Sequence, residues 1–264
     1  MSDAITVLMY HALARGDGRT EGADPHYAVS RAQFRRHLQM IGAAGKRVSS
    51  VAELLGAHRA QTGCVAFTFD DGHVSNAEAV EDLVAHGGSA DFFVNPGMVG
   101  KRHHLSWTTL RAMADAGMSI QSHGQNHRYL DELCASEVEA ELADSKREIE
   151  DRLGRAVAVF APPGGRVVPG LGDLARRVGY RAVCSSRAGL WRPEGRTWDV
   201  PRMAVLASTS DTQLRRWVEQ NALDLAVGTL RYRLLGAAKG VLGNERYERF
   251  RRALLGVASP GAGR

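Results

Sequence analysis

The sequence predicts an α/β protein built around a parallel sheet. Short apolar runs alternate with longer amphipathic stretches over about 180 residues, which is typical of strand–helix repeats. Polar residues, prolines and glycines collect directly after most of the apolar runs, as at the functional mouth of such folds. A chain of 264 residues is long enough for one barrel or for two small domains. The pattern by itself leaves an open sheet and a closed barrel as alternatives.

The strands are predicted from short runs rich in β-branched and aromatic side chains. One of them, Cys64–Phe69, reads as a fully buried strand that stops at Asp70. We expect strands at 5–10, 47–49, 64–69, 89–94, 118–122, 156–160 and 181–184.

The helices are predicted from apolar residues at helical spacing and from capping residues. Ser30 is expected to cap the first helix, Ser75 the third, and Ser136 with Glu139 to form a capping box for the fifth. We expect helices at 31–44, 51–60, 76–85, 107–116, 137–153 and 171–178.

Beyond Thr212 the pattern becomes helical and basic, so we predict a barrel over 1–210 and a C-terminal helical extension over 211–264. The extension holds ten basic and five acidic residues, which accounts for the whole net charge of +5. One interpretation is helices packed on the barrel with a solvated basic face, and the other is peripheral docking on an anionic membrane. Both interpretations rest on apolar residues that alternate with the arginines at helical spacing: Leu214, Trp217, Val218, Leu234, Leu235, Val241, Leu242, Phe250, Leu254 and Leu255.

Composition excludes several classes of protein. No basic block or zinc-finger spacing indicates nucleic-acid binding. The chain has no run of about 18 apolar residues, and its start lacks the features of a signal peptide. Three cysteines far apart, without a CxxC pair, favour a reducing cytoplasmic setting and disfavour a catalytic thiol. We therefore expect a cytoplasmic protein. If the basic extension docks on a membrane, that membrane would be the inner face of the cell membrane.

Two strand ends carry the residues of a metal site. Asp70 and Asp71 follow one predicted strand, and ordinary packing gives no reason for two adjacent carboxylates there. His123 and His127 follow another, at a spacing that places both on one face of a helical turn, although such a pair can also be a solvated surface pair. Two imidazoles and Asp71 would bind one divalent ion with open positions for water, and Asp70 would then be free to act as a general base.

The motifs Thr68-Phe69-Asp70-Asp71-Gly72, His123-x-x-x-His127 and Pro162-Pro163-Gly164-Gly165 resemble the first three motifs of the polysaccharide deacetylase family. This family contains the NodB homology domain and is also called carbohydrate esterase family four. The segments Ala90-Asp-Phe-Phe-Val94 and Leu8-Met-Tyr-His11 resemble its bacterial exopolysaccharide members, and the likeness spans roughly residues 5–206.

The resemblance implies a distorted (β/α)7 barrel that removes acetyl groups from N-acetylated sugars with one divalent ion. Zinc is the expected ion, with cobalt, nickel and manganese as alternatives. Asp70 matches the base, which activates a metal-bound water as nucleophile, and the metal ligands match Asp71, His123 and His127. Pro163 and Gly164 match the segment that lines the sugar groove, where a backbone N–H near them would hold the oxyanion.

Two departures from the family pattern stand out. Ala161 replaces an arginine that contacts the base, so Arg166 or Arg202 is expected to supply that charge, and Arg202 is also a candidate for substrate binding. The late histidine that usually protonates the amine is absent, because His127 is the last histidine.

Another group must therefore act as the general acid. We predict His11, which ends the first strand, for this role. The alternatives are His73, His26 and a double role for Asp70; His11 could also serve only to hydrogen-bond a loop.

These observations lead to three functional hypotheses. The first is a metal-dependent deacetylase acting on an N-acetylhexosamine-containing glycan or a lipid- or nucleotide-linked precursor. The second is a pseudoenzyme that keeps the metal and binds glycan or scaffolds a polysaccharide synthesis complex, and the third is a hydrolase of small non-sugar amides. The intact ligand set and Asp70 favour the first, whereas the missing late histidine favours the second.

Overall fold

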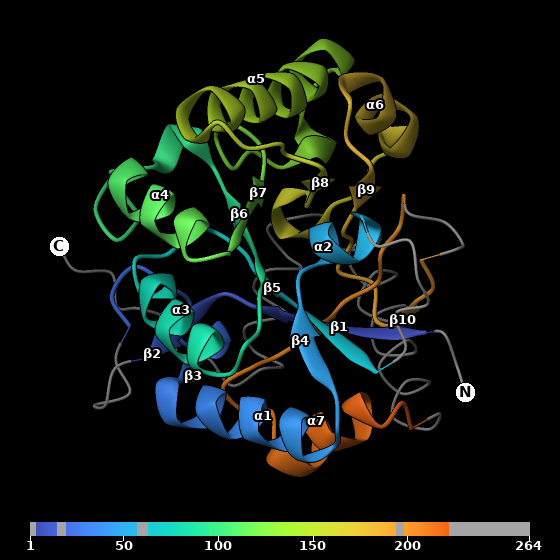
Figure 1. Ribbon diagram of the computed structural model, residues 1–264. Coiled ribbons are helices and arrows are strands. Elements are labelled where there is room, and N and C mark those ends of the chain that lie inside the picture. Colours follow the sequence, from blue (N-terminus) through green and yellow to red (C-terminus); the bar gives the residue numbers. More distant parts are fainter. Residues whose placement is uncertain (1–3, 15–19, 57–62, 194–197, 222–264) are drawn as a thin grey trace, which may run out of the picture.

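The computed structural model describes residues 4–14, 20–56, 63–193 and 198–221. Its main sheet has the strand order β10-β1-β5-β6-β7-β8-β9, with β11 also paired to β1 and β4 to β5. All of these pairs are parallel except β1 with β10. The strands are β1 (Ile5–Tyr10), β4 (Arg47–Ser49), β5 (Cys64–Phe69), β6 (Asp91–Val94), β7 (Ser119–Ser122), β8 (Val159–Phe160), β9 (Ala182–Val183), β10 (Leu190–Trp191) and β11 (Met203–Ala204). The sheet is curled with helices around it (Figure 1), as in a (β/α)7 barrel.

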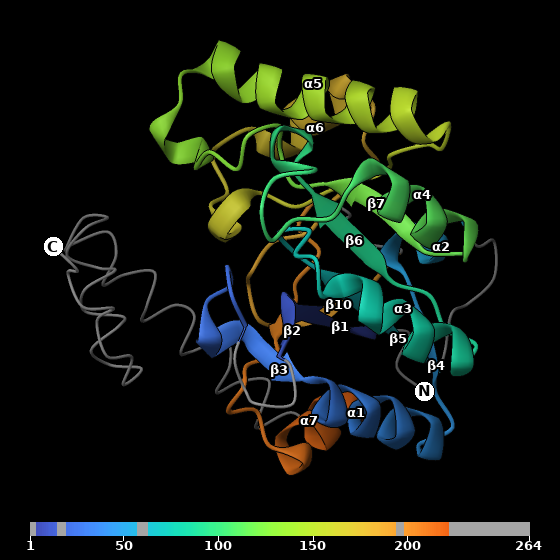
Figure 2. The same ribbon diagram turned by 90° about the vertical axis from the view of Figure 1, so that its left-hand side faces the viewer.

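Most of the described helices lie on the outside of this sheet, and α2 lies over one end of the barrel (Figure 1 and Figure 2). They are α1 (Arg31–Ala43), α2 (Val51–Gly56), α3 (Asn76–Ala85), α4 (Trp107–Asp115), α5 (Ala135–Leu153), α6 (Leu171–Val178) and α7 (Asp211–Val218). A small parallel pair, β2 (Ala12–Ala14) with β3 (Ala28–Ser30), and four 3-10 turns complete the fold. The turns are η1 (Pro25–Tyr27), η2 (Pro96–Met98), η3 (Leu130–Glu132) and η4 (Pro163–Gly165).

Both faces of the central strands are buried, which explains why they read as continuous apolar runs. All six residues of β5 are buried. Phe67 and Phe69 belong to the cluster under the outer helices, whereas Ala66 belongs to a second cluster inside the barrel. Val51 and Leu54 of α2 join that inner cluster, so α2 covers the barrel interior at one end.

Most predicted elements are confirmed, and β1, β4, β5, α3 and α6 have the expected bounds. The predicted capping box of α5 is wrong: the helix begins at Ala135, and the box pairs Cys134 with Glu137. Ser75 does precede α3, but it makes no capping hydrogen bond, because its hydroxyl accepts the N–H of Leu13 at 2.8 Å. At Ser75 a tertiary contact has replaced the local one, whereas at α5 the capping box remains local and begins two residues earlier than predicted.

The described start of the C-terminal extension packs on the barrel. Leu214, Trp217 and Val218 of α7 are buried, and α7 lies beside α1 in both views (Figure 1 and Figure 2). The Thr6 hydroxyl donates to the Trp217 carbonyl at 2.8 Å, and Arg36 pairs with Asp211 at 3.0 Å. These three apolar side chains therefore face the barrel and not a membrane.

The other apolar residues of the extension, from Leu234 onwards, lie outside the described residues, so membrane docking there stays a prediction. Among the residues that the structure describes, none of the helices combines the length and apolarity needed to cross a bilayer.

Candidate metal centre

Three side chains from two loops converge at the carboxyl ends of β5 and β7. The carboxylate of Asp71 and the imidazoles of His123 and His127 offer ligand atoms that all lie within 4.8 Å of one another. An Asp71 oxygen, Oδ1, is 3.3 Å from His123 Nε2 and 3.1 Å from His127 Nε2. The Asp71 and His127 side chains are 43% and 36% exposed, so one side of the cluster faces solvent. This donor set fits a divalent ion with positions left for water or substrate.

The two histidines do not lie on a helical turn, and that expectation is wrong. Residues 123–128 form an irregular loop in which His127 has the left-handed φ of +58°. Asp71 has a φ of +71°, also rare for a residue with a side chain. Both ligands therefore reach the centre through strained backbone, which the surrounding structure must hold in place.

Two residues that the site prediction did not include hold the histidine loop. Glu141 of α5 is buried and accepts the backbone N–H of Asn126 at 2.9 Å and its side-chain amide at 3.1 Å. Asn95, after β6, donates to the carbonyls of His123 and Gly124. The sequence did contain a signal for Glu141. An acidic residue on the apolar face of a helix, beside Leu142, is unusual and indicates a buried partner.

The ring of His123 is fixed by a hydrogen bond at its far side. Nδ1 donates to the Ala161 carbonyl at 2.7 Å, which leaves Nε2 toward the centre. Burial opposes protonation of His123, but the hydrogen bond to Asp71 and the charge of Asp70 outweigh it and raise its pKa. Burial also acts to raise the pKa of Asp71, yet its hydrogen bonds to His123 and His127 hold that pKa well below the usual value. The arrangement thus keeps Asp71 as a carboxylate.

Asp70 is buried next to this cluster and is held by Arg202. The guanidinium makes a two-pronged contact with the carboxylate, at 2.6 Å to Oδ1 and 2.9 Å to Oδ2. Arg202 also donates to the Ser185 carbonyl at 3.0 Å. Burial acts to raise the pKa of Asp70, but the charges of Arg202 and His123 outweigh it and lower that pKa. Asp70 is therefore ionised at neutral pH.

Of the two arginines considered for this charge, the structure places Arg202 against the base. Its side chain is fully buried, so the candidate role in substrate binding does not fit its position. Arg166 instead pairs with Asp131 and Glu132, both at 3.1 Å, and its guanidinium lies 3.5 Å above the ring of Tyr129.

Pro163 and Gly164 form the η4 turn. Gly164 has a φ of +61°, and a Cβ there would lie 2.8 Å from the ring of Tyr129, so only glycine fits without displacing that ring. The N–H groups of Gly165 and Arg166 bond within the turn. The N–H of Gly164 makes no hydrogen bond with the described part of the chain, so it is available to a ligand.

His11 lies between β1 and β2 and contacts the ring of Tyr27 at a centroid distance of 4.4 Å. Its Nδ1 is buried without a hydrogen-bond partner among the described residues. Burial lowers the pKa of His11, against the charges of Asp71 and Asp70, which raise it.

The other candidate acids are placed differently. Both ring nitrogens of His73 are engaged, Nδ1 with the Ser75 hydroxyl and Nε2 with the Glu21 carbonyl. His26 lies in the η1 turn with its ring against Tyr27.

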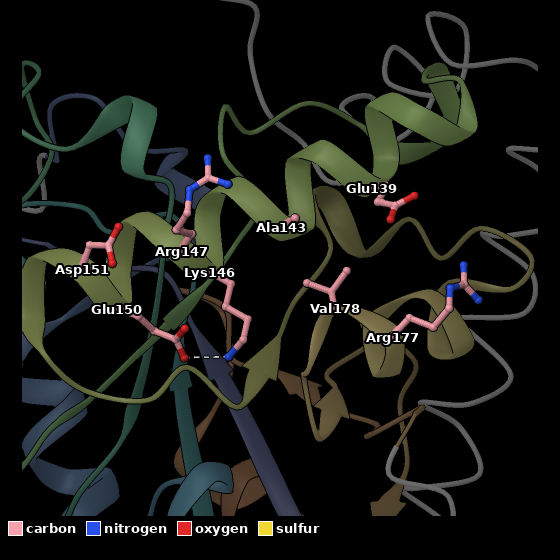
Figure 3. Close-up of a pocket in the computed structure, with 8 residues that line it drawn as sticks. All are labelled: Glu139, Ala143, Lys146, Arg147, Glu150, Asp151, Arg177 and Val178. Atoms are coloured by element: carbon pink, nitrogen blue, oxygen red, sulfur yellow. Dashed lines mark hydrogen bonds and ion pairs between the residues drawn. The ribbon is translucent and has the colours of Figure 1, made fainter.

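A second concave region lies on the outer surface between α5 and α6 (Figure 3). Two of its polar side chains bond each other: Lys146 Nζ donates to Glu150 Oε1 and also to the Val157 carbonyl, both at 2.6 Å. None of the metal-cluster residues lines it.

Comparisons with known proteins agree with the motifs and the fold. Residues 57–183 match the polysaccharide deacetylase family. YxkH, a Bacillus subtilis (strain 168) protein assigned as a polysaccharide deacetylase, is 24% identical over 220 residues, which is 81% of this chain and 76% of that protein. The Streptococcus pyogenes deacetylase PplD, solved in complex with acetate, superposes with a TM-score of 0.72 at 24% identity, over 82% of this chain and 97% of PplD. IcaB from Ammonifex degensii gives a TM-score of 0.70 at 23% identity, over 83% and 98% of the two chains. The chain therefore carries a polysaccharide deacetylase domain of the NodB type, that of carbohydrate esterase family four.

Proposed function

We propose that this protein is an active metal-dependent deacetylase that removes N-acetyl groups from an amino-sugar-containing glycan or glycan precursor. The observation that carries the proposal is the buried Asp70–Arg202 pair beside a cluster of one carboxylate and two imidazoles. In the part of the chain that the structure describes, Arg202 is the side chain that bonds the buried Asp70 carboxylate. Burial of such a charged pair costs free energy, and its place next to the cluster supports a catalytic role.

The chain offers a group for each part of amide hydrolysis. A divalent ion held by Asp71, His123 and His127 would polarise the acetyl carbonyl and acidify a water molecule. Asp70 takes a proton from the attacking water as its oxygen bonds to the carbonyl carbon, while Arg202 keeps the carboxylate oriented. The free N–H of Gly164 is the candidate donor to the carbonyl oxygen as it becomes negative.

The C–N bond then breaks, and the amine must receive a proton as acetate leaves. His11 is our candidate donor, because its buried Nδ1 has no partner among the described residues and it feels the charges of both aspartates. In the alternative route, Asp70 returns the proton that it collected.

Acetate release tests this function. Purified protein loaded with zinc, cobalt, nickel or manganese is assayed on N-acetylglucosamine oligomers, sugar phosphates and small acetamides, with Asp70→Asn as the matched control. We expect acetate from at least one sugar with the native protein and a rate lower by orders of magnitude with the variant. Metal binding and glycan binding without acetate release from any sugar would establish the pseudoenzyme alternative. Release from small acetamides alone would establish the third hypothesis.

A further inference from the structure

A basic turn, Lys101-Arg102-His103-His104, lies beside the metal loops and has no part in the chemistry above. It closes on itself through the N–H of His104, which donates to the Lys101 carbonyl at 3.0 Å. Lys101 and Arg102 are exposed, and His103 and His104 are half-buried. Four consecutive residues that carry or can accept positive charge thus form one exposed tip.

Backbone hydrogen bonds fasten this turn to the loop of the ligand Asp71. Leu105 N–H donates to the Gly72 carbonyl at 3.0 Å, and Val74 N–H donates to the His103 carbonyl at 2.9 Å. His73 and His104 also form an antiparallel bridge. Since Gly72 directly follows a metal ligand, the turn is held next to the metal centre.

The segment that leads into the turn contacts the other metal loop. Gly97 N–H donates to the Gln125 carbonyl at 2.9 Å, between the ligands His123 and His127. A Cβ on Gly97 would lie 2.5 Å from the side chain of Asn126, so the two loops are in close contact there. The segment that carries the basic turn is therefore fastened at both ends to the loops of the metal ligands, so that holding its backbone costs little on binding.

The charge of the turn is weakly compensated. Arg102 has one acidic neighbour, Glu21, at 3.7 Å, with the two side chains 84% and 79% exposed, a geometry that contributes little energy. Lys101 has no ion-pair partner in the described part of the chain, and its ammonium contacts the sulfur of Met98 at 3.7 Å. The mouth also holds Asp131 and Glu132, but these pair with Arg166.

This positive tip does not follow from a generally basic surface, because the first 210 residues carry 24 basic and 24 acidic side chains. A neutral acetylated sugar offers such a tip only hydroxyl and carbonyl oxygens, whereas an anionic substituent would also be attracted by its charge.

We propose that the basic turn Lys101–His104 recognises an anionic group on the acetylated sugar, so that the substrate is a charged acetamido sugar. The inference rests on the proposed function, since it names the substrate class of that site. A phosphate ester and a uronic acid carboxylate both supply this chemistry.

Equilibrium binding separates this inference from catalysis. Calorimetry on the zinc-loaded protein compares a neutral N-acetylglucosamine trimer, N-acetylglucosamine 1-phosphate, UDP-N-acetylglucosamine and a uronate-containing N-acetylated oligosaccharide. We expect the anionic sugars to bind more tightly at low salt and to lose that advantage in about 0.5 M salt. Whichever class of sugar, phosphate-containing or uronate-containing, gains more affinity over the neutral trimer identifies the anionic group that the turn recognises.

The double variant Lys101→Ser/Arg102→Ser should lower the affinity for anionic sugars about 5- to 10-fold and leave the neutral trimer unchanged. Its matched control, Arg176→Ser/Arg177→Ser, removes the same charge from α6, on which Arg177 lines the outer groove (Figure 3), and should change neither affinity. Equal loss for neutral and anionic sugars, or equal effects of the two double variants, would overturn the inference. Because affinity is measured, a protein that binds anionic sugars through the turn but releases no acetate would refute the proposed function alone.

Discussion

From Asp70 to His127 the site is made by two loops that follow β5 and β7, which lie on either side of β6 in the sheet. Its other side, from Ala161 to Arg202, is made by elements brought together from far along the chain. On the first side, β5 and β7 have six and four residues, and the ligands come one, two or five residues after a strand end. On the second side, β8, β9 and β11 have two residues each, and Arg202 reaches Asp70 across 132 positions of sequence.

The two sides of the site therefore depend on the sequence in different ways: one on short local motifs, the other on a contact between distant residues. The metal ligands lie in short motifs directly after β5 and β7, and the parallel order β5-β6-β7 brings these strand ends to one edge of the sheet. The ionised state of the base, Asp70, depends on one buried arginine, Arg202, which lies 132 positions away in the sequence. Substitutions on the two sides should therefore have different effects. Variants of the metal ligands should lose the ion, and variants of Arg202 should lose stability or the orientation of Asp70.

The largest effect is expected on the motif side. Changing His123 and His127 together to alanine should abolish stoichiometric metal and acetate release, because Asp71 alone cannot hold a divalent ion tightly. Metal content after mild chelation and dialysis measures this, with His86→Ala/His104→Ala as a control that removes two histidines outside the cluster. One zinc retained by the His123/His127 variant would place the site elsewhere.

Asp70→Asn should keep the metal and lower the rate by about two to four orders of magnitude, the usual contribution of a positioned general base. Metal content and kcat on the best sugar are the paired measurements. If the ion were lost, the roles of Asp70 and Asp71 would be exchanged; an unchanged rate would remove Asp70 from the mechanism.

Arg202→Ala tests the second side of the site. The substitution leaves Asp70 buried without its partner, which should lower the free energy of unfolding by about 3 to 5 kcal/mol. Denaturant unfolding measures the change, and Arg187→Ala is the control, since its pair with Asp199 is about half exposed and worth less than about 1 kcal/mol. Adding Asp70→Asn to Arg202→Ala should restore part of the loss, and a purely additive result would show that the pair is not coupled.

His11→Ala tests whether the first strand supplies the acid. A general acid acts while protonated, so the native rate should fall as pH rises past its pKa, and the variant should lose this alkaline limb along with about 10- to 100-fold in rate. The pH–rate profile is measured beside metal content and circular dichroism, which should not change. Near-normal hydrolysis would favour Asp70 as the group that returns the proton.

The smallest expected effect lies at the far end of the barrel, at Asp91. Burial raises the pKa of this carboxyl to about 7, although it accepts the N–H groups of Val51 and Ala52 at the start of α2. Because the folded state holds the proton more tightly than the unfolded chain, stability should fall as pH rises from about 4 to about 7 and level off above that. In Asp91→Asn, unfolding free energies at pH 5 and pH 8 should differ less than in the native protein; an unchanged difference would mean that another group dominates.

The local pattern of apolar and polar residues was sufficient to predict most of the strands and helices. The alternation of short apolar runs and amphipathic stretches predicted the strands and helices, since each element buries residues at its own spacing. Position after a strand end was enough to group Asp71, His123 and His127, because parallel strands bring their carboxyl ends to one edge. By contrast, predictions of local geometry failed where tertiary bonds compete, as at the hydroxyl of Ser75 and in the loop of His127, whose residue Asn126 bonds to Glu141.

What the sequence by itself determined is the order of the elements and the chemistry of the metal ligands, because both depend on neighbours a few residues apart. Only the tertiary structure decided that Arg202 and not Arg166 holds the base, that Glu141 supports the histidine loop, and that the segment from Gly97 to Leu105 contacts both metal loops. These are contacts between residues separated by up to 132 positions, and a side chain's type does not reveal which distant partner will satisfy its charge. Burial forces such partners to pair, and the fold alone selects them.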